Sequence, residues 1–118
     1  MAYNSKFSGA EVDNLLDKIK NISTVYPKVS HGTADTSFAL TPNTLHTWGE
    51  VTSLTLTLGT EESGVANEYL AEFVSGSTAT SLSLPDTIKW LNGKTPEIAS
   101  GKTYQLSILD GLAVLLEF

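Results

Sequence analysis

Short runs in which apolar residues alternate with serine or threonine dominate the chain from residue 36 onward. The clearest run covers residues 51–58, where three leucines are separated by single threonines (Leu54, Leu56, Leu58). A period of two places successive side chains on opposite faces of an extended chain, so the pattern is typical of half-buried β-strands. Turn residues recur roughly every 8–12 positions, a spacing that favours an all-β domain.

The strongest turn signal lies near the C-terminal end. Asp110 and Gly111 separate two apolar runs, residues 103–109 and 112–118, and such a pair readily adopts the positive φ angles of a two-residue hairpin. Together with the alternating runs, it predicts an antiparallel β-sandwich or barrel-like domain of about seven or eight strands over residues 36–118. The predicted fold class is therefore mainly β.

A different pattern precedes this β-domain. Ser8 and Glu11 form an S-x-x-E capping box, and the flanking Phe7 and Val12 match a hydrophobic staple. We expect a short α-helix over about residues 9–21. It would belong to an N-terminal segment, residues 1–24, used for oligomerisation or attachment. Residues 25–35 are expected to be a linker with room for one short strand around residues 25–29.

The apolar residues of the predicted helix form one narrow stripe that fits coiled-coil a and d positions over about two heptads. A helix of about 13 residues is marginal alone in water, so either the chain's own β-domain or the same helix in neighbouring subunits must cover the stripe. Isoleucine at both kinds of position favours three or more strands. The expected oligomer-interface residues are Val12, Leu15, Leu16, Ile19 and Ile22.

Composition excludes several partners. The net charge is −6, and every basic residue is a lysine, so the bidentate arginine contacts typical of nucleic-acid recognition are missing. No apolar run approaches the ~20 residues of a membrane-spanning helix. The N-terminus is polar and lacks the apolar core of a secretory signal, which predicts synthesis in the cytoplasm without a signal peptide. We expect neither a nucleic-acid nor a membrane partner.

Candidate catalytic groups do not converge in the sequence. There is no cysteine, and the serines lie outside any G-x-S-x-G elbow. His31 and His46 have no carboxylates at metal-binding spacing, so we expect both to be surface residues without a metal. Glu68 and Glu72 lie on the outer face of one predicted strand, away from any apolar pocket. The sequence therefore predicts a non-enzymatic protein without cofactor or metal.

Aromatic side chains leave one binding hypothesis open. Trp48, Trp90 and Tyr69 lie in predicted strands, where exposed rings could stack on sugars. In a domain of this size, tryptophan on strands more often belongs to the core or a subunit interface. These three residues form the candidate ligand platform.

Several motifs resemble those of virion proteins from gut-bacterial phages and prophages. Residues 3–18 are similar to their K-[FY]-[ST]-G-x-E-[VI]-D-x-[LI]-L-D-K helix, and residues 45–59 are similar to their W-G-E-V-x-S-L-x-[IL]-x-L-G motif. Residues 67–69, 82–86 and 103–108 follow in the same order. The similarity extends over most of the chain, and the second motif is more specific than the first.

This resemblance implies a head-fibre, tail-fibre or other appendage protein of a tailed phage, usually assembled as a trimer. Because the helix and β-domain stand almost alone, the leading hypothesis is a homotrimeric head fibre or capsid-decoration protein. It would be located in the virion, bound to capsid or tail proteins, with adhesion to host-surface glycans as a further role. The alternative hypothesis is a carbohydrate-binding, lectin-like module that uses exposed aromatic residues.

Overall fold

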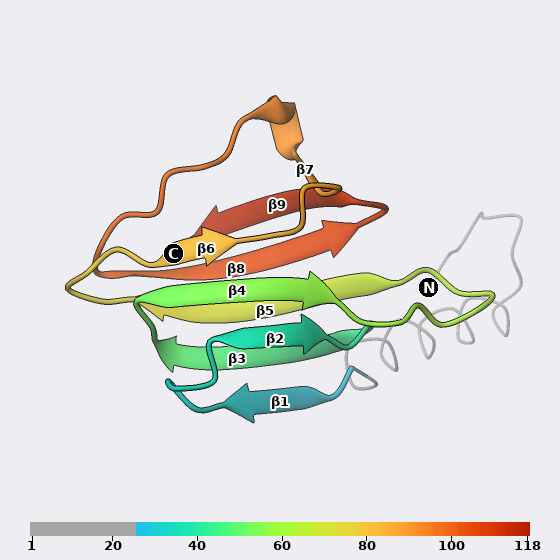
Figure 1. Cartoon of the computed structure of the whole chain (residues 1–118), viewed down its shortest axis with the longest axis horizontal. Helices are drawn as coiled ribbons and strands as arrows, with labels where there is room; N and C mark the ends of the chain where they lie inside the picture. The colour runs from blue at the N-terminus through green and yellow to red at the C-terminus, as the bar shows by residue number, and fades with distance from the viewer. Residues whose placement is uncertain (1–25) are drawn as a thin grey trace, which may run out of the picture.

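The computed structural model describes residues 26–118, which form nine β-strands in two sheets and no α-helix (Figure 1). The expected helix and its five interface residues lie outside the described residues. The elements are β1 (Lys28–His31), β2 (Ser37–Leu40), β3 (Thr44–Glu50), β4 (Ser53–Leu58), β5 (Glu68–Ser75), β6 (Ser81–Ser83), β7 (Lys89–Trp90), a 3-10 turn η1 (Leu91–Gly93), β8 (Lys102–Leu109) and β9 (Leu112–Glu117).

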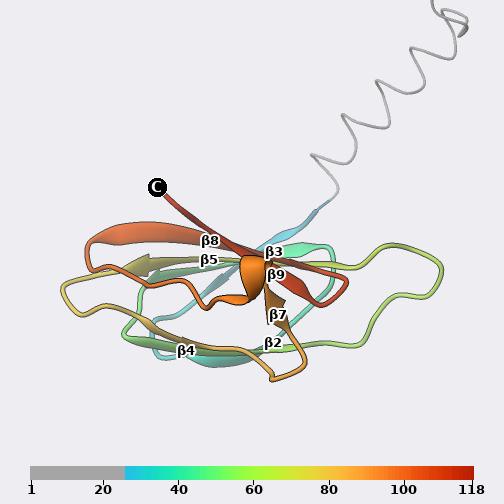
Figure 2. The same ribbon diagram turned by 90° about the horizontal axis from the view of Figure 1, so that it is seen from above.

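The nine strands form two layers. The larger sheet has the strand order β1-β3-β5-β8-β9-β7, and the smaller sheet has the order β2-β4-β6. Seen from above, β3, β5 and β8 lie in one layer and β2 and β4 in the other (Figure 2). From β1 to β6, each strand lies in the opposite sheet from the strand before it. These six strands therefore form three successive coils, as in a β-solenoid, and the β8–β9 hairpin extends the larger sheet.

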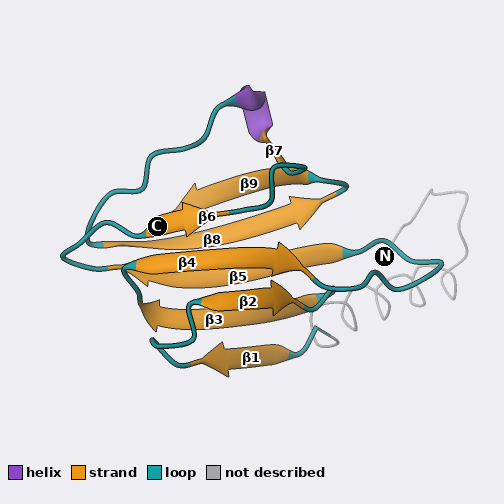
Figure 3. Cartoon of the chain, in the orientation of Figure 1, coloured by secondary structure: helices purple, strands orange, loops and turns teal. Residues whose placement is uncertain are grey.

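The predicted mainly β fold is confirmed, but the predicted antiparallel arrangement is wrong for most of the described residues. Five of the seven strand pairings are parallel, and only β5–β8 and β8–β9 are antiparallel. The short connections after β2 and β3 look like hairpin turns in the sequence. In the structure they carry the chain from one sheet to the other, so sheet neighbours run in the same direction (Figure 3).

The C-terminal hairpin has the predicted form. Leu109 pairs with Leu112, and the two residues between them, Asp110 and Gly111, have φ angles of 54° and 74°. Positive φ at both positions matches the twist of the flanking strands. Strand β1 lies within the segment expected as a linker, overlaps the short strand expected there around residues 25–29, and pairs with β3 at the edge of the larger sheet.

The core lies between the two sheets. Alternate positions of β5 point inward, and Tyr69, Ala71 and Phe73 are buried there. Leu54 and Leu56 of β4 meet them from the smaller sheet as members of the same buried cluster. Burying a large apolar side chain contributes roughly 1.5–3 kcal/mol, so these inner faces hold the two layers together.

Candidate functional site

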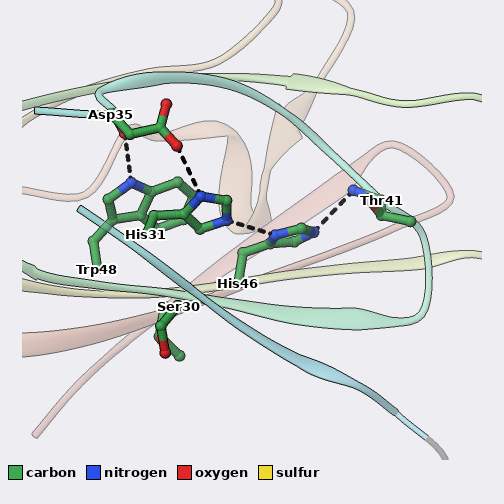
Figure 4. Close-up of polar contacts among 7 residues, drawn as sticks. Ser30, His31, Asp35, Thr41, His46 and Trp48 are labelled. Atoms are coloured by element: carbon green, nitrogen blue, oxygen red, sulfur yellow. Dashed lines mark hydrogen bonds and ion pairs between the residues drawn. The ribbon is translucent and has the colours of Figure 1, made fainter. Parts of the chain in front are cut away.

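Four residues at the β1–β2–β3 corner form a continuous chain of hydrogen bonds, here called the histidine relay (Figure 4). The Asp35 carboxylate lies 2.8 Å from Nδ1 of His31. Nε2 of His31 lies 2.9 Å from Nδ1 of His46, although the two residues are 15 positions apart. Nε2 of His46 accepts the backbone N–H of Thr41 at 3.0 Å. The relay thus joins β1, β3 and both ends of the segment that carries β2.

Chemistry fixes the direction of every bond in the histidine relay. A backbone N–H can only donate, so Nε2 of His46 must keep its lone pair, and the single proton of a neutral His46 sits on Nδ1. His46 then donates to Nε2 of His31, and His31 carries its own proton on Nδ1, facing Asp35. Both histidines are therefore neutral Nδ1–H tautomers, and each proton points toward Asp35.

Aromatic rings surround the relay. The His31 and Trp48 rings are stacked, with centroids 4.4 Å apart and planes 15° from parallel. Phe38 of β2 packs against His31 with its centroid 4.3 Å away. The indole Nε1 of Trp48 donates to the backbone oxygen of Asp35 at 2.6 Å, which fixes the loop that carries the carboxylate.

Both histidine side chains are buried, and the prediction that they are surface residues is wrong. His46 is 1% exposed and the His31 side chain 7%. Parallel pairing of β1 with β3 places His31 opposite Trp48 and close to His46. The sequence contained a signal for the burial of His46. This residue lies two positions from Trp48, and residues two apart in a strand share a face.

Burial lowers the pKa of His46 below its ordinary value of 6.5, and the neighbouring His31 lowers it further. The charged imidazolium is disfavoured because it would lose water and lie beside a second basic ring. His46 is therefore held in its neutral form at pH 7.

The histidine relay does not end at a nucleophile. Ser30 precedes His31 in the chain, but its side chain points to the opposite side of β1, where Thr47 donates to it at 3.4 Å (Figure 4). Within residues 26–118, no cluster of three or more His, Cys, Asp or Glu residues could hold a metal ion. The geometry suits a pH-sensitive structural contact better than acid–base catalysis.

A second feature is the outer face of the larger sheet. Leu45, Leu70, Val114 and Leu116 point away from the core there, and we call them the outer-face stripe. Leu45 pairs with Leu70, and the row continues through Ser107 of β8 to Val114. The stripe lines a hollow of about 180 Å³. Leu116 is 58% exposed, and Leu112 and Phe118 protrude from the same side of the hairpin.

The outer face of the smaller sheet has the opposite character. Ser53, Thr55 and Thr57 of β4 are exposed, as are Ser81 and Ser83 of β6. A hydroxyl-rich face remains well hydrated, whereas on the larger sheet Leu116 is exposed and Leu45, Leu70 and Val114 are half-buried around an apolar hollow. The two outer faces of one domain are therefore built for different surroundings.

The three candidate ligand-platform residues are in different environments. Trp48 and Tyr69 are 4% and 3% exposed, so neither offers a ring face to a ligand. The Tyr69 hydroxyl donates to the Gly59 backbone oxygen at 2.8 Å and closes the loop after β4. Trp90 is half-buried and lies between two shallow hollows, which it lines together with Pro96 and Leu115. The structure does not bring the three rings together.

No helix among residues 26–118 is long and apolar enough to span a membrane. Comparison of the chain with protein-family models, with curated proteins and with solved structures finds no match. The resemblance of the sequence motifs to phage virion proteins therefore remains a prediction.

Proposed function

We propose that this chain is a non-enzymatic structural protein of a tailed-phage virion, a head-fibre, decoration or other appendage component that assembles as a homotrimer. The motif resemblance in residues 3–18 and 45–59 supports the virion assignment. A β-domain preceded in the sequence by a predicted helix fits a fibre subunit. In this proposal the helix over residues 9–21 places its apolar stripe at a threefold seam.

The outer-face stripe is the observation that carries this proposal. A leucine- and valine-lined face is costly to leave in water, at roughly 25 cal/mol for each Å² of apolar surface. The occupant we assign to it is a second copy of this chain. One face carries both a hollow, floored by Leu45 and Leu70, and protruding apolar side chains, Leu116 and Phe118. A chain that supplies both halves of a contact can form a closed ring.

The position at which the chain enters the domain also supports a second copy of the chain as the partner of the outer-face stripe. Strand β1 is the first described strand, and it forms the edge of the larger sheet beside Leu45, which pairs with Lys28. The described chain therefore begins next to the outer-face stripe. A helical seam and a stripe-to-stripe contact can then lie on one threefold axis, with the hydroxyl-rich sheet facing outward.

The direct test is recovery of the chain from particles. Phage particles released by lysis of the producing host would be banded on a density gradient and their proteins identified by mass spectrometry. The proposal predicts the chain in the particle band, at a fixed ratio to the major capsid protein. Its presence only in the free-protein fraction would contradict a structural role in the virion.

A carbohydrate-binding module is the second candidate, and Trp90 is the observation that favours it. This ring is partly exposed, and the Thr95–Pro96 segment lines one of the hollows beside it. A glycan array would compare the unmodified chain with Trp90→Ala. Binding that disappears in a folded Trp90→Ala variant supports the lectin-like function. An empty array with the unmodified chain contradicts it.

A further inference from the structure

The two rings of the histidine relay cannot take an additional proton and keep every hydrogen bond intact. A proton added to Nε2 of His31 would face the Nδ1–H of His46 across 2.9 Å. Moving the His46 proton to Nε2 relieves that clash but creates another, with the Thr41 N–H at 3.0 Å. A proton added directly to His46 produces the second clash at once. Every form of the relay in which one of the two rings carries the added proton therefore contains one donor facing a donor.

Water cannot repair this contact in place. His46 is 1% exposed, and no buried side-chain nitrogen or oxygen in residues 26–118 lacks a hydrogen-bond partner. A buried donor without an acceptor carries the full free-energy cost of losing its hydration. Protonation of either ring must therefore be accompanied by movement of one strand. The neutral relay closes the corner, and the charged relay opens it.

Few groups near the two rings could compensate for the added charge. Phe38 from β2 and Trp48 from β3 present aromatic rings to His31. Ala71 of β5 pairs with His46 in the sheet. Asp35, on the connection from β1 to β2, provides the one carboxylate among residues 26–118 in contact with His31, and this contact becomes an ion pair only when His31 is protonated. That carboxylate can stabilise a charge on His31, but it does not remove the donor–donor clash at His46.

We propose that the histidine relay is an acid-sensitive latch, which holds β1 and the β1–β2 connection against β3 at neutral pH and releases them when one proton is added. The latch goes beyond the proposed function, because it depends only on contacts within the β-domain. Strand β1 lies at the start of the described chain, so opening the latch frees the strand through which the chain enters the domain.

The opening is local because β1 is weakly held. It pairs only with β3, over four residues at the edge of the larger sheet. The β5–β8 pairing, in contrast, runs over eight residues in the middle of that sheet. Strands with few partners open at lower free energy than central strands. Loss of the relay should therefore free β1 while β5 and β8 remain paired.

The first measurement uses the full chain and needs no variant. Nitrogen-15 NMR at about pH 7.5 would identify the ring tautomers, and we expect both His31 and His46 to carry their proton on Nδ1. Amide hydrogen exchange would then be followed from about pH 7.5 to pH 5, after correction for the intrinsic pH dependence of exchange. We expect protection in β1 to fall by up to tenfold per pH unit, while β5 and β8 keep theirs.

Two variants give the control. The double variant His31→Gln/His46→Gln keeps a side-chain oxygen that can accept the Thr41 N–H and leaves no titrating ring in the relay, so its β1 protection should be independent of pH in this range. If that variant does not fold, Asp35→Asn serves instead. It removes the carboxylate that stabilises a charge on His31, so the loosening should move to lower pH.

Three results would overturn the proposal. An Nε2–H tautomer of His46 at neutral pH would refute the direction of the relay. Unchanged β1 protection down to pH 5 would refute the latch. An equal loss of protection in β1, β5 and β8 would show global unfolding rather than local release.

Discussion

Nε2 of His31 lies 2.9 Å from Nδ1 of His46, and this contact joins the edge strand of the larger sheet to its neighbour through two neutral rings. Each ring is also bonded at its other nitrogen, to Asp35 or to the Thr41 N–H. Protonation of this pair is therefore linked to the contact between β1 and β3.

The first prediction concerns stability and pH. Because the pKa of His46 is lowered in the folded protein, the unfolded chain binds a proton that the folded chain does not. The stabilisation is therefore complete above the ordinary value of 6.5 and is lost as pH falls toward and through the lowered value. We expect the free energy of unfolding to fall by up to ~1.4 kcal/mol per pH unit in this window. Urea titrations at several pH values measure it, and a profile that is flat between pH 7 and pH 5 would refute the assignment.

The second prediction concerns the core between the sheets. Phe73 is fully buried among residues of both layers, so Phe73→Ala should destabilise the domain by about 3–5 kcal/mol. Thr55→Ala, on the exposed face of β4, is the matched control and should change stability by less than about 0.5 kcal/mol. Equal effects in thermal unfolding would mean that the two layers are not packed as described.

The third prediction concerns Gly59, where the chain leaves β4. A Cβ at this position would lie 2.7 Å from the Leu40 backbone oxygen, which also accepts the Gly59 N–H at 2.8 Å. Gly59→Ala should therefore cost about 1–3 kcal/mol, because backbone must move. A Cβ at Gly32 would meet no atom within 4 Å, so Gly32→Ala should be close to neutral. Denaturant midpoints of the two variants would test the difference.

The β fold could be predicted because the sequence records it locally. The alternation of Leu54 and Leu56 with threonine assigns β4, and the Asp110-Gly111 pair assigns the hairpin. Strand direction was missed because it depends on which sheet each strand joins, and a two-residue connection such as that between β3 and β4 has no local signature of crossing between sheets.

The candidate site was missed for a similar reason. His31 and His46 come together only because β1 lies parallel to β3. The sequence of neither strand alone predicts that they pair in parallel. The face shared by His46 and Trp48 was readable from their spacing. It did not reveal that a second histidine and Asp35 would complete the relay.

The fourth prediction concerns assembly through the outer-face stripe. Leu116 is 58% exposed in the single chain, so Leu116→Asp should leave the fold intact and weaken association between copies. Leu91→Asp is the matched control, because Leu91 is 50% exposed and lies in the 3-10 turn, outside the stripe. Sedimentation velocity over a concentration series would compare them, and equal behaviour of the two variants would assign the interface elsewhere.

The helical seam has its own test. Replacing Leu15 and Ile19 together with aspartate would bury charges at the predicted threefold seam and should dissociate the trimer. An unchanged oligomer would refute the seam, and the stripe alone would then carry the assembly.

The solution mass of the unmodified full chain tests the central claim most directly. Light scattering on a sizing column would measure it at neutral pH, where the histidine relay is closed. A homotrimer of a 12.6 kDa chain predicts a mass of about 38 kDa. A mass of 12.6 kDa at every concentration would contradict trimeric assembly and leave the lectin-like module as the better account of this domain.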